Sequence, residues 1–200
     1  MRTVILASAL AALVACANKT KNAEPPADAS KSAANAGVAP APFTAAQIRE
    51  ATQQGRTYRF KTEMLGQPPH TQQIEFIAVS PTGCTTKNQR FDLEGKPVGG
   101  AGVAQATWDD LVKHAAYPAA STSISDEPCE TPAGKFSCKI YVVRTQDNGV
   151  KLVRKVWFAK SLPGAPVKTV VERGGAVVMR MTLQSHTPGA AAAPRAVTGR

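Results

Sequence analysis

The residue types that could support acid–base or metal chemistry are scattered along this 200-residue chain. The three histidines, His70, His114 and His186, are far apart, and no pair has the spacing that a zinc or copper site uses. Asp109 and Asp110 are adjacent carboxylates, but they fall in the first turn of a predicted helix, where carboxylates stabilise the positive end. We therefore predict no catalytic activity, no metal and no cofactor. The alternative, a hydrolase, would require His114 to meet a carboxylate and a hydroxyl in the folded protein.

A glycine-rich segment, Gly99-Gly100-Ala101-Gly102, precedes the same predicted helix. Phosphate-binding loops place a lysine directly after the last glycine, whereas Val103 follows here. We expect this segment to be a flexible loop that binds no ligand.

Cys16 ends the run Leu13-Val14-Ala15-Cys16, far from the other three cysteines. The chain begins with one positive charge, on Arg2, followed by an apolar run from Val4 to Val14 that only Ser8 interrupts. Such a run is too short to remain as a membrane-spanning helix, but it suits the apolar core of a signal peptide. Together these residues resemble the signal peptide and lipobox of bacterial lipoproteins.

This resemblance implies covalent chemistry at Cys16. The sulfur would receive a diacylglyceryl group, residues 1–15 would be removed, and the new amino terminus would be acylated. One acyl chain holds a protein only marginally at a membrane, whereas two or more anchor it stably. Ala17, rather than aspartate, after the acylated cysteine resembles the usual pattern for retention in the outer membrane. We expect a lipoprotein on the periplasmic face of the outer membrane; an ordinary secretory signal with a chance cysteine is the alternative.

The chain is basic, because 24 lysines and arginines face 14 aspartates and glutamates, a net charge of +10. In a cytosolic protein this excess would suggest nucleic acid as a partner. A lipoprotein outside the cytoplasm rarely meets nucleic acid, so we expect the membrane, acyl chains or anionic envelope components as partners instead. Since no arginine-rich run occurs, most of this charge is predicted to lie on a solvated surface.

Composition divides the chain into four parts. Residues 1–15 are the predicted signal peptide, and residues 16–42, rich in Ala, Asn, Lys, Ser and Pro, are the lipidated cysteine and a flexible tether. Residues 43–186 are predicted to form a single β-rich domain, for which 43% hydrophobic residues suffice to pack a core. Residues 187–200 are predicted to be a disordered tail.

Two short helices are expected in the domain. One is predicted from Thr44 to Gln54, with Gly55 placed to end it. The other is predicted from Thr107 to Pro118, with apolar residues at helical spacing. Trp108 shares this apolar stripe, which favours a core anchor over a ligand platform.

The remaining segments predict β-strands joined by short turns. The last strand shows the alternation most clearly, because Val177, Met179, Met181 and Leu183 fall on one face. The pattern predicts an α+β fold that is mainly antiparallel, with a meander sheet curling as a half-barrel around the two helices. The expected strands span residues 57–65, 72–80, 83–93, 121–131, 135–146, 150–161, 165–173 and 176–185.

The hairpin around Pro132 carries two of the three remaining cysteines. If Ala133-Gly134 is a two-residue turn, Cys129 faces Cys138 at a non-hydrogen-bonded position, the geometry that a cross-strand disulfide needs. Such a bridge would stabilise the fold by about 2.5–3 kcal/mol in the chain-entropy model. Pairing of Cys84 with one of the two is the alternative, and a redox-active CxxC spacing is absent.

The same hairpin and its sequel also resemble a set of poorly characterised bacterial envelope proteins. The shared motifs are a PAG-x-F hairpin at residues 132–136, WFA at residues 157–159 and PG-x-P at residues 163–166. The resemblance implies a fold similar to the lipoprotein carriers LolA and LolB, whose curved antiparallel sheet shelters acyl chains. No arginine or lid segment matches the functional elements of those carriers, so lipid carrying is not transferred residue by residue.

The strands also supply aromatic, aliphatic and methionine side chains that could line an apolar cavity between the sheet and the helices. We therefore predict a non-catalytic lipoprotein that binds an apolar or acyl ligand or an envelope partner. A filled core in a purely structural or interaction lipoprotein is the alternative, and an envelope hydrolase is a weaker one. The candidate lining residues are Tyr58, Phe60, Ile74, Phe76, Tyr141, Trp157, Met179 and Met181.

Overall fold

The structure is a computed structural model of the chain, and it describes residues 37–190. These residues belong to one compact unit. Cys16 and the predicted signal peptide, most of the predicted tether and the end of the predicted tail lie outside the described part. Two helices precede and interrupt the strands, and every strand pair is antiparallel. The elements are α1 (Ala45–Ala51), β1 (Thr57–Met64), β2 (Gln67–Val79), β3 (Gly83–Phe91), β4 (Pro97–Thr107), α2 (Trp108–Lys113), the 3-10 helix η1 (Ala119–Ser121), β5 (Thr122–Thr131), β6 (Gly134–Asp147), β7 (Val150–Ala159), β8 (Lys168–Arg173) and β9 (Ala176–Thr187).

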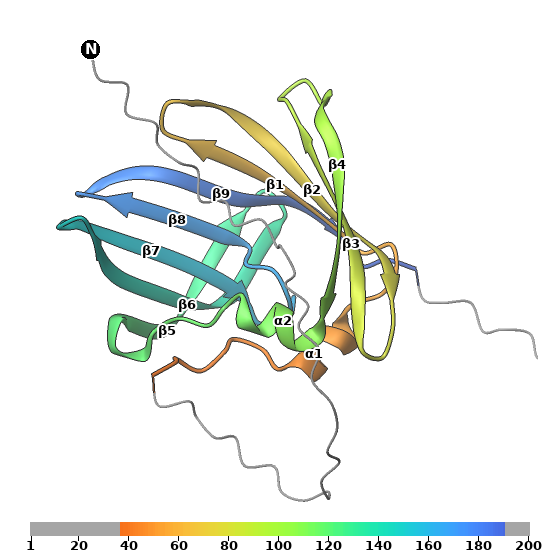
Figure 1. Cartoon of the computed structure of the whole chain (residues 1–200), viewed down its shortest axis with the longest axis horizontal. Coiled ribbons are helices and arrows are strands. Elements are labelled where there is room, and N and C mark those ends of the chain that lie inside the picture. Colours follow the sequence, from red (N-terminus) through yellow and green to blue (C-terminus); the bar gives the residue numbers. More distant parts are fainter. Residues whose placement is uncertain (1–36, 191–200) are drawn as a thin grey trace, which may run out of the picture. The chain divides into compact units, whose positions relative to one another are not determined.

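The nine strands form a single open sheet in the order β4-β3-β2-β1-β9-β8-β7-β6-β5 (Figure 1). Two meanders, β1–β4 and β5–β9, are joined where the first strand pairs with the last. The prediction of a mainly antiparallel, curved sheet with two short helices is therefore confirmed.

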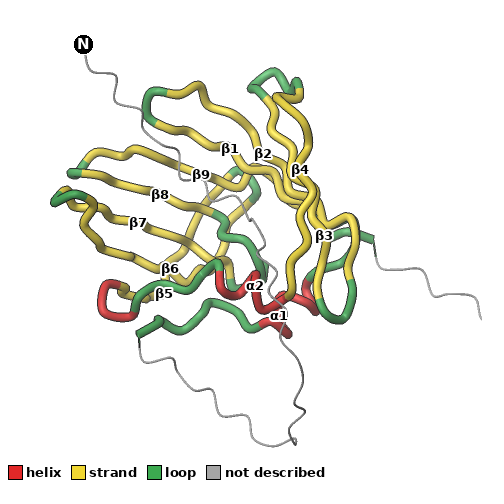
Figure 2. Tube along the Cα trace, in the orientation of Figure 1, coloured by secondary structure: helices red, strands yellow, loops and turns green. Residues whose placement is uncertain are grey.

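The sheet has two different ends. Four hairpin turns, at residues 65–66, 92–96, 148–149 and 174–175, lie at one end, which we call the open rim (Figure 2). Helices α1 and α2 and the β2–β3 and β7–β8 connections lie at the other end, which we call the helix end. This separation follows from the meander, because alternate hairpins of an antiparallel sheet lie at the same end.

The core fills the space between the helices and one face of the sheet at the helix end. Phe43, Ile48 and Trp108 pack there with strand residues such as Tyr58 and Leu183. Aromatic rings meet edge to face or tilted, with centroid distances of 6.2 Å for Phe43–Phe158, 5.4 Å for Tyr141–Phe158 and 5.7 Å for Tyr117–Tyr141. The Tyr141 hydroxyl also donates to the Pro40 carbonyl at 2.7 Å, which ties the segment before α1 to the sheet.

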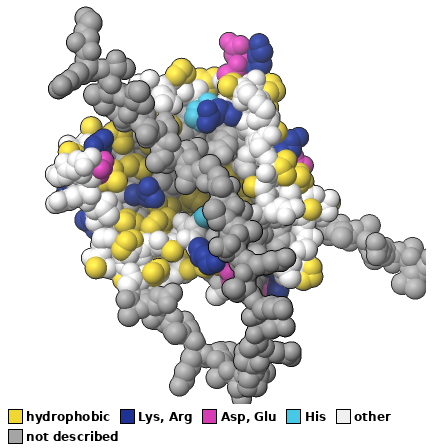
Figure 3. Space-filling view, in the orientation of Figure 1, with side chains coloured by type: hydrophobic (Ala, Val, Ile, Leu, Met, Phe, Trp, Pro, Cys, Tyr) yellow, Lys and Arg dark blue, Asp and Glu magenta, His cyan; other side chains and the backbone are white. Residues whose placement is uncertain are grey.

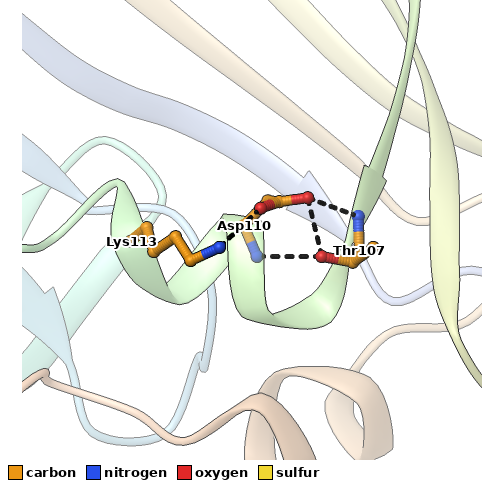
Figure 4. A network of polar contacts seen from close by, with 3 residues as sticks. All are labelled: Thr107, Asp110 and Lys113. Carbon is orange, nitrogen blue, oxygen red and sulfur yellow. Dashed lines mark hydrogen bonds and ion pairs between the residues drawn. The ribbon is translucent and has the colours of Figure 1, made fainter. Parts of the chain in front are cut away.

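Helix α2 begins with the predicted threonine cap (Figure 4). The Asp110 amide donates to Thr107 Oγ1 at 3.1 Å, and the Thr107 hydroxyl donates to Asp110 Oδ2 at 2.7 Å. Lys113 Nζ lies 3.0 Å from Asp110 Oδ1. These hydrogen bonds lower the pKa of Asp110 to about 2. The carboxylate is thus used by the helix cap, as the capping interpretation predicts.

Trp108 is buried and its Nε1 donates to the Ser80 carbonyl at 3.1 Å. The prediction that Trp108 anchors the core is confirmed.

One expected loop is instead a strand. Residues 99–102 belong to β4, an exposed edge strand that pairs with β3 across a register shift between Asn88 and Arg90. Gly99 has a φ of +73°, which the irregular backbone at this shift allows, and a Cβ at Gly100 or Gly102 would meet nothing within 4 Å. The pairing with β3, which local composition does not reveal, overrides the low strand propensity of glycine.

Candidate functional site: the helix-bearing face of the sheet

Four of the predicted lining residues lie inside the packed core at the helix end. Tyr58, Phe60 and Tyr141 are each 1% exposed, and Phe76 is also buried. Burial raises the pKa of Tyr58 to about 12, although the guanidinium of the buried Arg56, 4.9 Å from the ring centroid, opposes this shift. Arg56 donates to the Ala51 carbonyl at 2.9 Å, so it caps the carboxyl end of α1.

Three further predicted residues, Ile74, Met179 and Met181, are only partly buried. Met181 pairs across the sheet with Thr62 and Thr169, and Met179 pairs with Met64 and Val171, one row nearer the open rim. These rows therefore continue the core face away from the helices.

Trp157 lies on the opposite face. It pairs with Ile140, whereas its neighbour Val156 pairs with Tyr141, and adjacent residues of a strand point to opposite faces. Its Nε1 donates to Glu127 Oε1 at 3.1 Å, and Lys168 Nζ lies 5.0 Å from the ring centroid. The β5–β6 hairpin covers this face by passing behind β7 and β8, which brings β5 into contact with β9 (Figure 1).

One row of side chains crosses the helix-bearing face near the open rim. The register aligns residues of five adjacent strands, β6, β7, β8, β9 and β1, in a single line. Four of the five are apolar, and Arg154, which is exposed, is the exception. The row consists of Val143, Arg154, Val171, Met179 and Met64.

Figure 3 shows hydrophobic side chains on this side of the sheet with basic side chains among them. The pKa of His70, on β2 in the next row, is lowered by burial and by the nearby Arg90, which favours the neutral imidazole. The described part of this face thus combines one mainly apolar row, which includes Arg154, with a neighbouring row that also carries threonines and His70.

The turns at the open rim also carry exposed aliphatic side chains. Leu65 is 75% exposed, Leu93 61%, Val177 44% and Val150 37%, and each lies on a different hairpin. A groove of about 240 Å³ runs between the ends of β1 and β9, and it is lined by Glu63, Met64, Leu65, Val177, Val178, Met179 and Arg180. Exposed aliphatic side chains thus occur at all four turns of the open rim.

The predicted facing of Cys129 and Cys138 is wrong. Cys129 pairs with Phe136 and Cys138 with Glu127, a register two residues away from the predicted one. The turn residues are Pro132-Ala133, because proline fits the turn without an N–H and the Thr131 hydroxyl accepts a hydrogen bond from the Ala133 amide at 3.2 Å. The two cysteines therefore lie on a diagonal of the same face.

Cys129 and Cys138 are both free thiols, as is the buried Cys84 on β3. Burial, together with the neighbouring Cys129 side chain, raises the pKa of Cys138 to about 12. Burial also raises the pKa of Cys84, which lines a groove of about 420 Å³ at the helix end between the β2–β3 turn and the start of α2. A disulfide between Cys129 and Cys138 is not formed in this structure.

The histidines lie on three separate elements: His70 on β2, His114 at the carboxyl cap of α2 and His186 on β9. Among residues 37–190, no cluster of three or more His, Cys, Asp and Glu side chains is arranged to hold a metal ion. In the same part of the chain, no helix has the length and apolar character needed to cross a membrane.

The sequence interpretation missed Arg154 as a member of this face. Alternation along β7 does group it with Leu152, Val156 and Phe158. However, Val153 and Trp157 on the other face are equally apolar, so the sequence does not reveal which face the helices cover.

Comparison with known proteins adds likeness of fold at low identity. No protein-family model and no curated protein matches the chain. A Bacteroides fragilis protein, described as exported with a YmcC-like fold, aligns at a TM-score of 0.45 and 13% identity, over 74% of this chain and 99% of that one. A Parabacteroides distasonis protein, described as a lipoprotein, aligns at a TM-score of 0.44 and 12% identity, over 68% of this chain and 96% of that one. MucB aligns at a TM-score of 0.48 and 14% identity, over 74% of this chain and 58% of that one. Likenesses at this level say nothing about what this chain binds.

Proposed function

We propose that this protein is a non-catalytic, lipid-anchored lipoprotein of the bacterial outer membrane that binds an acyl chain or a similar apolar ligand. The binding surface is the helix-bearing face between the packed core and the open rim. One observation carries the proposal: past the helices this face continues through Met181, which is flanked by two threonines, to the mainly apolar row of Met179 at the open rim.

The residue types of these rows suit an acyl chain. Met64, Met179 and Met181 have unbranched, polarisable side chains that adapt to a ligand of irregular shape. Each methylene group removed from water contributes about 0.8 kcal/mol, so a chain lying across two rows gains several such contributions. The solid packing at the helix end supports a ligand that lies along the outer rows and stops at Tyr58 and Tyr141.

The open rim supports a ligand that enters from a lipid surface. Leu65, Leu93, Val150 and Val177 place exposed aliphatic groups at the four turns, next to the end of the apolar rows. Acylation of Cys16 would hold the domain close to such a surface. The packed core also favours a second candidate, an interaction lipoprotein whose rim contacts a protein or an anionic envelope component.

A matched pair of variants on β9 separates these two functions. Met179 and Thr182 lie on the same strand and are both partly buried, but Met179 pairs with Met64 and Val171, whereas Thr182 pairs with Lys61 and Lys168, so they point to opposite faces. The mature chain (residues 16–200) carrying Cys16→Ser is titrated with cis-parinaric acid, a fluorescent fatty acid, so that no acyl anchor competes for the probe. We expect Met179→Gln to weaken binding roughly tenfold, because it places an amide against the chain, and Thr182→Gln to leave it unchanged, because it places the same amide on the opposite face.

Saturable binding that only Met179→Gln weakens supports the acyl-binding function. Absence of saturable binding to the parent chain, or equal weakening by both variants, overturns it. The first of these outcomes would favour the interaction lipoprotein.

A further inference from the structure

Arg154 occupies an unusual position for an exposed cation. On β7 it lies between Leu152 and Val156, and across the sheet it lies between Val143 on β6 and Val171 on β8. All four neighbours are aliphatic, and three of them are buried. A guanidinium is normally found at a solvated surface or beside an anion, not in the middle of an apolar row.

Arg154 also differs from two other basic residues near the open rim, Arg173 and Lys155. Arg173 Nη2 lies 3.1 Å from Asp147 Oδ2, and Lys155 Nζ lies 2.7 Å from Glu172 Oε1. For Arg154, no carboxylate of residues 37–190 is within ion-pair distance. The titratable group that senses its charge is the phenol of Tyr117, which comes from the segment after α2. The guanidinium therefore faces the helix-bearing side without a partner of opposite charge there.

We propose that the ligand is an anionic amphiphile and that Arg154 binds its anionic headgroup. This inference rests on the proposed function, because the apolar rows would hold the acyl chain while the guanidinium holds the charge. Carboxylate and phosphate oxygens share the geometry that accepts two parallel N–H groups from arginine, so either headgroup fits this chemistry. The low polarity of the surrounding row strengthens such a bond relative to one in water.

Arg144 provides a matched control. It lies on the neighbouring strand β6, pairs with Val153 and therefore points to the opposite face, and it is also exposed. Arg154→Gln and Arg144→Gln remove the same charge from positions close together in the sheet. Because both side chains are exposed, neither variant should lower the melting temperature by more than a degree or two.

The test compares three probes of equal chain length: palmitic acid, hexadecyl phosphate and hexadecanol. Binding to the mature chain carrying Cys16→Ser is measured by displacement of cis-parinaric acid at physiological ionic strength and neutral pH. We expect the parent chain to bind at least one of the two anionic probes about tenfold more tightly than hexadecanol. Arg154→Gln should abolish this preference and leave hexadecanol binding unchanged, while Arg144→Gln should retain the preference. The anionic probe that binds more tightly than hexadecanol identifies the headgroup as a carboxylate or a phosphate.

Three outcomes would overturn the inference. Equal affinity of the parent chain for all three probes would remove the need for a headgroup site but leave acyl binding in place. Equal loss of preference in both variants would indicate the general positive charge of the protein. Retained preference in Arg154→Gln would place the headgroup elsewhere. If no probe binds the parent chain, the proposed function fails together with the inference.

Discussion

The filled helix end and the open rim predict a large difference between two truncations on β9. Leu183 is fully buried, pairs with Phe60 and donates its amide to the Val167 carbonyl at 2.8 Å. Leu183→Ala removes three carbon atoms from the packed helix end and leaves a cavity, which costs about 2–5 kcal/mol of unfolding free energy. Val177→Ala, on the same strand at the open rim, removes atoms that are already 44% exposed, and we expect a loss of less than about 1 kcal/mol.

Urea unfolding of the two variants, followed by tryptophan fluorescence, measures this difference directly. Trp108 and Trp157 are both buried, on opposite sides of the sheet, so their emission reports the whole domain. The urea midpoint should fall strongly for Leu183→Ala, while the m-value stays unchanged. In thermal unfolding, each kcal/mol lost should lower the melting temperature by about 2–4 °C. Equal losses in the two variants, or a larger loss for Val177→Ala, would refute the assignment of a filled helix end and an open rim.

Three other predictions concern the cap, the thiols and the anchor. Because its pKa is depressed to about 2, ionised Asp110 contributes stability that is present above about pH 4 and is lost as the pH falls toward 2. Asp110→Asn should flatten that part of the plot of unfolding free energy against pH. Superimposable plots for the variant and the wild type would contradict the role of the cap. Because its pKa is raised to about 12, Cys138 of the reduced protein should react with iodoacetamide at pH 8 far more slowly in the native state than in urea. Peptide mass spectrometry measures the two rates, and equal rates would contradict the burial of Cys138. Cys16→Ser should shift the protein from the membrane to the soluble fraction on cell fractionation, and unchanged membrane retention would count against lipid attachment at that residue.

The fold was predictable where local chemistry and global structure agree. Thr44 and Thr107 each combine with a polar side chain three residues later to form a capping box, and both helices begin at these caps. The first helix ends at Ala51, before the predicted Gln54: its carboxyl cap Thr52 has an extended backbone (φ −107°, ψ 118°), and the Thr52 hydroxyl donates to the Ile48 carbonyl at 2.7 Å. Leu183 lies in the core as the alternation along β9 predicts.

The features that sequence did not reveal depend on contacts between distant segments. The strand character of residues 99–102 comes from pairing with β3, and a stretch of glycine and alanine contains no local signal for it. The hairpin register around Cys129 and Cys138 depends on which two residues form the turn, and moving the turn by one residue changes every cross-strand pair. The burial of Trp157 on the face away from the helices depends on the curling of the β5–β6 hairpin, which brings β5 to β9 and Glu127 to the indole.

Native mass spectrometry of the full protein, extracted from cell membranes in mild detergent, tests the central proposal most directly. The account predicts a species with the mass of the acylated chain and a second species heavier by one non-covalent amphiphile, which collisional activation releases as an anion. The heavier species should be depleted in Met179→Gln and retained in Thr182→Gln. Acylated protein without a releasable amphiphile in any charge state, under conditions that preserve the folded domain, would contradict the account.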